Sequence, residues 1–253
     1  MESLLPWTIV IPLIGAGLII LARHRPNLRE TVTLLTAAAL FLSVVSLTPA
    51  VLDGGRPSLV IWGILPGLDL MLRVEPLGML FGLVASGLWI VNSLYSIGYM
   101  RGNKEQSQTR FYFFFAVSLA AAIGVAFAGN MLTLFMFYEI LTICTYPLVT
   151  HSGTAEAVKS GRTYLGILIS TSIGLLMVGI IWTWNAAGTL DFTPGGILKG
   201  KVSDGLIGVL LFLYMYGIGK AALMPIHRWL PAAMVAPTPV SALLHAVAVV
   251  KAG

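Results

Sequence analysis

Four ionisable side chains lie inside strongly apolar stretches of this 253-residue sequence: Glu139, Lys220, His245 and Lys251. A charged side chain at the centre of a lipid bilayer costs at least about 2.5–3.5 kcal/mol on insertion scales, so such residues are functional candidates. An acid, an amine and an imidazole can exchange protons, because burial and a neighbouring opposite charge act in opposite directions on the protonation of each group. The four residues therefore predict proton transfer within a membrane.

Glu139 lies near the middle of the apolar stretch "MLTLFMFYEILTICTYPLV". Thr142 and Tyr146 follow it at the spacings i+3 and i+7, which place a carboxylate, a hydroxyl and a phenol on one helix face. This polar stripe favours a hydrated path, because hydroxyl groups can hold water where hydrocarbon cannot. The alternative is a glutamate that only holds two helices together by pairing with a buried base.

Lys220 lies in "YGIGKAALMPIHRWLPAAM", shortly before Pro225. Proline removes a helical hydrogen bond and crowds the preceding turn, so we expect the helix to break at Pro225 and to leave backbone acceptors beside the lysine. Irregular backbone at membrane depth is tolerated only where it faces protein or water, which favours a cavity. The alternative is a lysine that extends to the interface from a helix end. His227 follows the break, and its position fits an interface residue as well as a proton carrier.

The last stretch, "TPVSALLHAVAVVKAG", places Thr238, Ser241 and His245 at i, i+3 and i+7 on one helix face. Lys251 lies about 120° around the same helix from His245, at 100° per residue. We therefore expect His245 and Lys251 to communicate through water rather than by direct contact.

The composition identifies the kind of protein that holds these residues. Hydrophobic residues make up 57% of the chain and charged residues 10%, which predicts a polytopic membrane protein. The basic residues sit singly in short loops, so no nucleic-acid surface is expected. A single cysteine, Cys144, excludes a disulfide framework, and the sequence has no paired His or Cys ligands, no phosphate loop and no nucleophile triad. We expect no metal, no cofactor and no redox site, so any redox step would belong to partner proteins.

The apolar runs predict an all-α fold with about seven complete transmembrane helices and an incomplete eighth, since about 20 residues cross the bilayer. The predicted spans lie near 4–22, 31–49, 76–99, 111–128, 131–150, 163–186 and 205–224, with the eighth from about 238. The segment 50–75 is either a short hairpin or an interfacial segment.

Basic residues are distributed unequally between alternate loops. One set of loops holds Arg23, Arg25, Arg29, Arg101, Lys104, Arg110, Lys159 and Arg162, and the other set holds Arg56, Arg73, Lys199 and Lys201. The positive-inside rule therefore predicts an N-terminus outside the membrane, which we expect to be a prokaryotic plasma membrane.

The stretch "KAALMPIHRWLPAAMVAPTPVSALLHAVAVVKAG" resembles the signature of the antiporter-like subunits shared by respiratory complex I, membrane-bound hydrogenases and Mrp multisubunit sodium/proton antiporters. "FYEILTICTYPLV" resembles the segment around that family's helix-five glutamate, and "HAVAVVKAG" is closest to the Mrp D subunit. The resemblance implies that Glu139 pairs with the broken-helix Lys220, and that His245 and Lys251 relay protons onward.

The resemblance also implies how the chain is divided: residues 1–109 form three N-terminal helices, and residues 110–253 form the first five-helix inverted repeat, truncated in helix eight. Two departures from the family are visible. Ala232 stands where the family usually has an aspartate, and the second repeat is absent, so the chain is a fragment, one part of a split subunit or a natural half.

The predicted function is that of a proton-translocating subunit of a multisubunit cation/proton antiporter or of an energy-converting redox complex. The alternative is a non-conducting structural half-subunit that supports assembly. The expected partners are other membrane subunits, including further antiporter-like subunits or a separate C-terminal half, together with H+, Na+ where exchange is coupled to it, and the lipid bilayer. A carrier of organic solutes is disfavoured, because no further buried charges remain to bind one.

Overall fold

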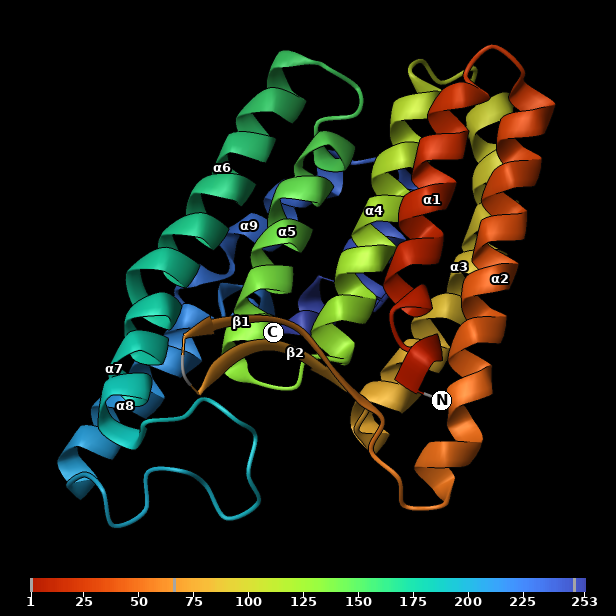
Figure 1. Ribbon diagram of the computed structural model, residues 1–253. Helices are drawn as coiled ribbons and strands as arrows, with labels where there is room; N and C mark the ends of the chain where they lie inside the picture. Colours follow the sequence, from red (N-terminus) through yellow and green to blue (C-terminus); the bar gives the residue numbers. More distant parts are fainter. Residues whose placement is uncertain (1, 66, 248) are drawn as a thin grey trace.

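The computed structural model describes residues 2–65, 67–247 and 249–253. Its long helices stand side by side, and a β-hairpin crosses one end of them (Figure 1). We call this the hairpin end, and we call the opposite end, which carries the turns at residues 22–25, 103–107 and 150–154, the basic end.

The first four long helices form one group. They are α1 (Trp7–Leu21), α2 (Pro26–Leu52), α3 (Pro76–Gly102) and α4 (Gln108–Ala126). Pro26 and Pro76 occupy the first turn of their helices, where the missing N–H leaves no hydrogen bond unmade. Helix α1 packs against α2 and α4, and α2 packs against α3. The predicted spans near 4–22, 31–49, 76–99 and 111–128 correspond to these helices.

The second group continues from α4. It contains α5 (Met131–Val149), α6 (Ala155–Thr171), a π-helical segment (Ser172–Met177, called the π segment below), α7 (Val178–Ala187) and α8 (Asp204–Gly217). Asn130, Thr154 and Ser203 each accept a hydrogen bond from the backbone three residues on, which explains where three of these helices begin. Helix α5 lies between α4 and α6.

After α8 the chain proceeds through short turns. They are Gly219–Ala221, Ile226–Arg228, α9 (Trp229–Ala232), Ala233–Val235, α10 (Thr238–Ala242), a π turn at Leu243–Val247 and Val250–Ala252. The helix therefore ends at Gly217, before Lys220, and not at Pro225 as the sequence predicts. Gly217 lies against the backbone of Leu176, and this close approach is possible because glycine has no side chain.

The segment 50–75 contains an antiparallel hairpin of β1 (Ser58–Leu65) and β2 (Leu68–Arg73), which resolves the two alternatives and departs from an all-α fold. The hairpin is attached to the helices through β2. The amide of Arg73 donates to Phe127 O (2.7 Å), and the amide of Met71 donates to the Thr133 hydroxyl (2.9 Å). These bonds fix β2 against the turn between α4 and α5.

Among the described residues, five helices are long and apolar enough to cross a membrane: α2, α3, α4, α5 and the continuous stretch Ala155–Ala187. Helices α1 and α8 and the stretch Thr238–Ala252 are apolar but shorter. The fold is therefore that of a multi-pass membrane protein, and the number of seven complete spans stays a prediction.

An ionic cluster joins α2, α3 and α4 at the basic end. The Arg101 guanidinium donates to Glu30 (Nε–Oε1, 2.9 Å), and Arg29 donates to Gln108 Oε1 (2.6 Å). Arg29 also lies 5.2 Å from the centre of the Tyr112 ring. Because Arg29 and Glu30 are buried and paired, this basic-end clamp holds α2 to α3 and α4.

Candidate functional site

Lys220 is fully buried, at 0% exposure, in the turn Gly219–Ala221 where α8 has ended. Its ammonium donates to the backbone carbonyl of Tyr138 and lies 3.2 Å from the centre of the Tyr138 ring. Its backbone N–H donates to the Tyr138 hydroxyl at 3.1 Å. One residue of α5 therefore supplies a carbonyl, a ring face and a hydroxyl to the lysine, which stabilises a buried cation.

The backbone around Lys220 is held in an irregular path from several sides. Trp229 Nε1 donates to the carbonyl of Gly219 at 2.8 Å. A Cβ on Gly219 would lie 2.3 Å from Thr171 Oγ1, so this turn packs closely on the end of α6. Ala222 has φ 53°, a left-handed conformation that costs a non-glycine residue roughly 1–2 kcal/mol. Such strain is typical of functional sites.

Glu139 follows Tyr138 on α5 and is half-buried. Its Oε1 is buried and has no hydrogen-bond partner in the described part of the protein. Lys220 and the Ser172 hydroxyl of the π segment are the polar groups that favour its charged form. Among the ion pairs within 4.0 Å in the described residues, none joins Glu139 to Lys220. The acid and the base are therefore neighbours without a direct contact.

The structure groups the polar residues of α5 differently from the predicted stripe of Glu139, Thr142 and Tyr146. The Thr142 hydroxyl donates at 3.1 Å to the Tyr138 carbonyl, the same atom that accepts from Lys220. Tyr146, which lies farther along α5, packs against Gly161 of α6. The buried polar row of α5 is Tyr138, Thr142 and Thr145.

Sequence reasoning missed three residues near Lys220: Tyr138, Thr145 and Tyr164. The Thr145 and Tyr164 hydroxyls are 2.6 Å apart, and both residues are fully buried. A signal was available for two of the three, because Tyr138 and Thr145 flank Thr142 at helical spacing. Tyr164 lies on α6, and only the folded structure shows which helix it faces.

The predicted residues of the last segment lie in short turns. His227 is half-buried in the turn Ile226–Arg228, and His245 is half-buried in the π turn Leu243–Val247. Each has one buried ring nitrogen without a hydrogen-bond partner in the described residues, Nδ1 of His227 and Nε2 of His245.

Ser241, Pro225 and Lys251 complete the predicted set. The Ser241 hydroxyl donates to Ala236 O at 3.4 Å, and Pro225 follows a cis peptide bond from Met224. Lys251 is exposed, in a turn that packs against Gly219–Ala221. The structure therefore brings Glu139, Thr142 and Lys220 together and leaves Lys251 at the surface.

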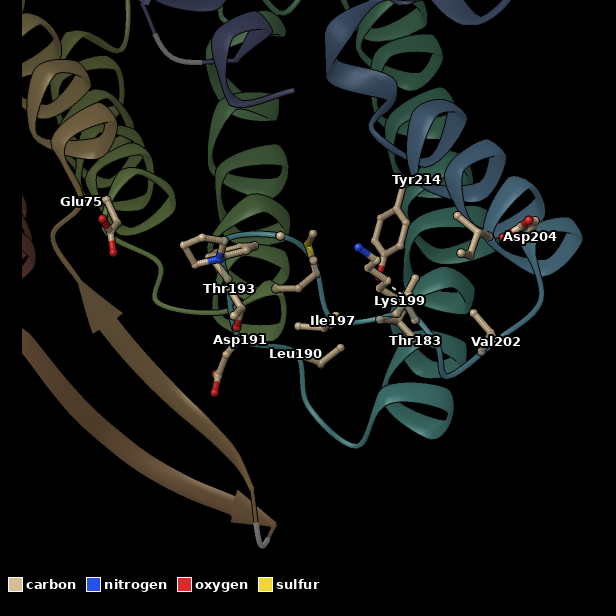
Figure 2. Close-up of a pocket in the computed structure, with 18 of the residues that line it drawn as sticks. Glu75, Thr183, Leu190, Asp191, Thr193, Ile197, Lys199, Val202, Asp204 and Tyr214 are labelled. Atoms are coloured by element: carbon tan, nitrogen blue, oxygen red, sulfur yellow. Dashed lines mark hydrogen bonds between the residues drawn. The ribbon is translucent and has the colours of Figure 1, made fainter.

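A pocket of about 750 Å³ opens at the hairpin end, between the loop 188–203 and the ends of α7 and α8. At its wall the Tyr214 hydroxyl donates to the Thr183 hydroxyl at 2.9 Å. Figure 2 shows Asp191 and Asp204 on opposite sides of this pair. We call it the hairpin-end pocket; its lining includes the charged side chains of Asp191, Lys199 and Asp204.

Apolar side chains separate this pocket from Lys220. The cluster consists of buried Phe135, Tyr138, Leu176, Ile180 and Leu190, with Tyr214 and Ile218 packed against them. Because Tyr214 lines the pocket and Tyr138 touches Lys220, the cluster occupies the space between the two. We call it the hairpin-side layer.

The described residues contain no group of three or more His, Cys, Asp or Glu side chains placed to hold a metal ion. The polar groups around Lys220 are a carbonyl, hydroxyls and one carboxylate. This set of groups is suited to proton exchange.

Residues 128–253, about half of the chain, match the family model "NADH:quinone oxidoreductase/Mrp antiporter, TM". The chain is 29% identical over 269 residues to NAD(P)H-quinone oxidoreductase subunit 5, organellar chromatophore 1, of Paulinella chromatophora. That match covers 98% of this chain and 40% of the relative. It is also 31% identical over 196 residues to the putative antiporter subunit mnhA2 of Staphylococcus aureus (strain JH9), covering 74% of this chain and 23% of the relative.

Two solved complexes contain chains with the same fold. One is the membrane-bound sulfane sulfur reductase, an archaeal respiratory membrane complex, with a TM-score of 0.85 at 24% identity, covering 100% of this chain and 51% of the other. The second is the Mrp complex of Dietzia sp. DQ12-45-1b, with a TM-score of 0.83 at 22% identity, covering 99% and 47%.

The chain thus spans about half or less of the length of each relative named here. The relatives named here are a subunit 5 and an mnhA2 antiporter subunit, so the finer resemblance to the D subunit stays a prediction. The matched range, residues 128–253, includes Glu139, Lys220 and His245. The chain belongs to the NADH:quinone oxidoreductase/Mrp antiporter family of membrane proteins.

Proposed function

We propose that this chain carries protons within a multisubunit membrane complex, with Lys220 as the central proton-binding group. The observation that carries the proposal is the complete burial of the Lys220 amine in a broken helix, beside a carboxyl oxygen that has no hydrogen-bond partner in the described residues. A buried amine and a buried carboxyl group each resist charge unless the other is charged too. Protonation of the two groups is therefore coupled.

In this proposal the protonation state of Glu139 decides whether the ammonium form of Lys220 is stable. When Glu139 is ionised, its charge favours the ammonium form of Lys220, and when Glu139 takes up a proton, that stabilisation is lost and Lys220 can release its own. Because the two side chains do not touch, a small movement of either one changes their interaction strongly. One elementary charge moved through 100 mV corresponds to about 2.3 kcal/mol, which a close pair of buried charges can supply.

The remaining parts of the proposal follow from the family. His245 and Lys251 would carry protons onward from Lys220, and residues 110–253 would form one repeat after three N-terminal helices at 1–109. The partners would be other membrane subunits, and the coupled process would be either exchange of Na+ for H+ or a redox reaction in a partner. The membrane would be a prokaryotic plasma membrane.

The experiment is proton transport by the complete complex in inverted membrane vesicles, followed with a pH-sensitive dye. We expect Lys220→Met and Glu139→Gln each to lower the rate at least about tenfold, which corresponds to about 1.4 kcal/mol. The matched controls are Lys159→Met and Glu156→Gln, which change exposed residues of α6 and should leave the rate unchanged. A Na+ pulse and a reductant, applied separately, distinguish exchange from redox-driven transport.

The structural alternative predicts the opposite result. If the chain only supports assembly, both site variants transport protons at the unmodified rate per assembled complex, and transport is lost only when whole helices are deleted. The amount of assembled complex, measured on native gels, separates the two readings. Full transport by Lys220→Met would overturn the proposal.

A further inference from the structure

The contact between Thr145 of α5 and Tyr164 of α6 has no part in the function proposed above. The two hydroxyl oxygens lie 2.6 Å apart, and both side chains are at 0% exposure. The Thr145 hydroxyl also lies 2.7 Å from the carbonyl of Leu141 and 3.1 Å from that of Thr142. Burying polar groups costs free energy unless they are hydrogen-bonded, and these contacts satisfy both hydroxyls inside the bundle.

The pair is connected to Lys220 along α5. The Tyr138 carbonyl accepts hydrogen bonds from both the Lys220 ammonium and the Thr142 hydroxyl. The next turn presents the Thr142 carbonyl to Thr145. Residues at i, i+4 and i+7 share one helix face, so Tyr138, Thr142 and Thr145 form a continuous polar row. The row begins at the lysine and ends at Tyr164.

A second connection runs through Trp229. Its indole N–H donates to Gly219 O, directly before Lys220, and its ring meets the Tyr164 ring edge-on with centroids 5.5 Å apart. Trp229 is itself fully buried. The Tyr164 ring is therefore positioned against the broken helix as well as against α5.

The polar row points toward the basic end. Helix α5 begins at the hairpin end and reaches the basic end at Val149, so Thr145 lies on the basic-end side of Lys220. Beyond Thr145 come Leu148 and Val149, both fully buried, and then His151. No hydrogen bond in the described residues joins the hydroxyl pair to His151. We call Leu148 and Val149 the basic-side layer.

We propose that the Thr145–Tyr164 hydroxyl pair is the relay through which Lys220 exchanges protons with the basic end. This inference rests on the proposed function of Lys220. Each hydroxyl accepts a proton on its oxygen and releases its own proton to the next acceptor, so the hydroxyls are chemically unchanged after each transfer. Thr142 shares the Tyr138 carbonyl with Lys220 and is the first hydroxyl of the relay, and a water that enters between Thr142 and Thr145 carries the proton to the pair. Water at the basic end is the last acceptor once the basic-side layer separates.

The test uses substitutions that remove one oxygen and keep the shape. Thr145→Val and Tyr164→Phe are each expected to lower proton transport by the complete complex about tenfold, or about 1.4 kcal/mol. The double variant should be no slower than the slower single variant, because the two hydroxyls act as one step. Thr145→Ser restores a hydroxyl and should recover most of the rate.

Matched controls remove the same groups elsewhere. Thr163→Val removes the neighbouring hydroxyl of α6, which bonds Lys159 O at the surface, and Tyr95→Phe removes an exposed phenol of α3. Both should transport normally. Rates are divided by the amount of assembled complex, so a loss of assembly is not counted as a loss of transport.

Two results would overturn the inference. One is an unchanged rate in both Thr145→Val and Tyr164→Phe, and the other is a Thr145→Ser variant as slow as Thr145→Val. Lys220→Met measured in parallel separates the two proposals: if it abolishes transport while the hydroxyl variants do not, only the relay is wrong. If Lys220→Met transports normally, the proposed function itself is wrong.

Discussion

Lys220 and Tyr138 show how this fold keeps an amine inside a membrane protein. The ammonium lies over the Tyr138 ring and donates to the carbonyl of the same residue, so a single position of α5 replaces much of the water that the cation has lost. The break in the chain after α8 supplies the space for that approach. The lysine is thereby stabilised by groups other than the Glu139 carboxyl.

His151 is a second buried ionisable residue, outside the membrane-spanning helices, in the turn between α5 and α6. Its ring lies edge-on to Phe111 with centroids 5.8 Å apart, and neither nitrogen has a hydrogen-bond partner in the described residues. Glu105 Oε2 lies 3.9 Å from His151 Nε2, and the Arg110 guanidinium donates to the His151 carbonyl at 2.8 Å. Burial, followed by the Arg110 charge, lowers the pKa of His151 below its usual 6.5, and Glu105 opposes them.

Because the folded protein disfavours protonated His151, the unfolded chain binds more protons as the pH falls below the usual pKa. Stability is thus complete above about pH 6.5 and declines as the pH falls toward the lowered folded value. We expect the melting temperature of the purified protein to fall between about pH 7 and pH 5, and to fall less in His151→Phe.

The control for this prediction is His24→Phe, which removes an exposed histidine at the same end. It should keep the pH dependence of the unmodified protein. An equally steep decline in His151→Phe would show that other groups cause it.

Two irregular segments, the π segment and the end of α8, pack against each other beside the site. The π segment contacts α8, and its residue Leu176 approaches the backbone of Gly217. π-helical turns are rare overall, and those that occur are often found at functional sites. The end of α8 and the π segment therefore fit together only with glycine at position 217.

Gly217→Ala tests this packing. A Cβ at 217 would lie 2.5 Å from the Leu176 nitrogen, so backbone must shift, and overpacking of this kind costs about 1–3 kcal/mol. We expect a lower melting temperature and slower proton transport. In contrast, Gly208→Ala lies in the same helix with no atom within 4 Å, and it should be neutral or stabilising by up to about 1 kcal/mol. Equal stability of the two variants would contradict the prediction.

The long helices could be predicted from the sequence, and the irregular segments could not. Hydropathy locates the apolar parts of α2 to α5 and of the stretch from α6 to α7, but it misses the first two turns of α6, where Glu156, Lys159 and Arg162 make the helix polar. The sequence predicts that the helix ends at Pro225, because proline is a recognisable helix breaker. The actual end at Gly217 depends on packing against Leu176, which is distant in the sequence, so the sequence carries no local signal for it. Glu139 and Lys220 could be found as charges in apolar runs, but Tyr164 could not, because a tyrosine in an apolar helix carries no such signal.

The two ends of the molecule differ in charge and in the structural elements that form them. The basic end carries the clamp of Arg29, Glu30 and Arg101, and the hairpin end carries β1, β2 and the pocket beside loop 188–203 (Figure 1). Helices α1 to α4 are regular, whereas the breaks lie in α6 to α10. Movement during transport is therefore expected in the second group.

The orientation of these ends in the membrane is a prediction from the distribution of basic residues. In a Cys144→Ala background, Lys199→Cys should react with a membrane-impermeant thiol reagent added to intact cells, and Asn103→Cys should react only after the membrane is opened. Both positions are exposed, so access to the reagent decides the result. The reverse pattern would place the N-terminus inside.

Tyr138, the α5 residue that contacts Lys220, belongs to the hairpin-side layer, and the basic-side layer lies farther along α5 toward the basic end. An insulating membrane that stores a voltage is discharged by any continuous file of water, and a lysine that faced both solutions together would provide one. With apolar side chains on each side, the amine can bind a proton without short-circuiting the two compartments. Under the proposed function, these two layers keep the gradient from discharging through Lys220 until one of them opens alone.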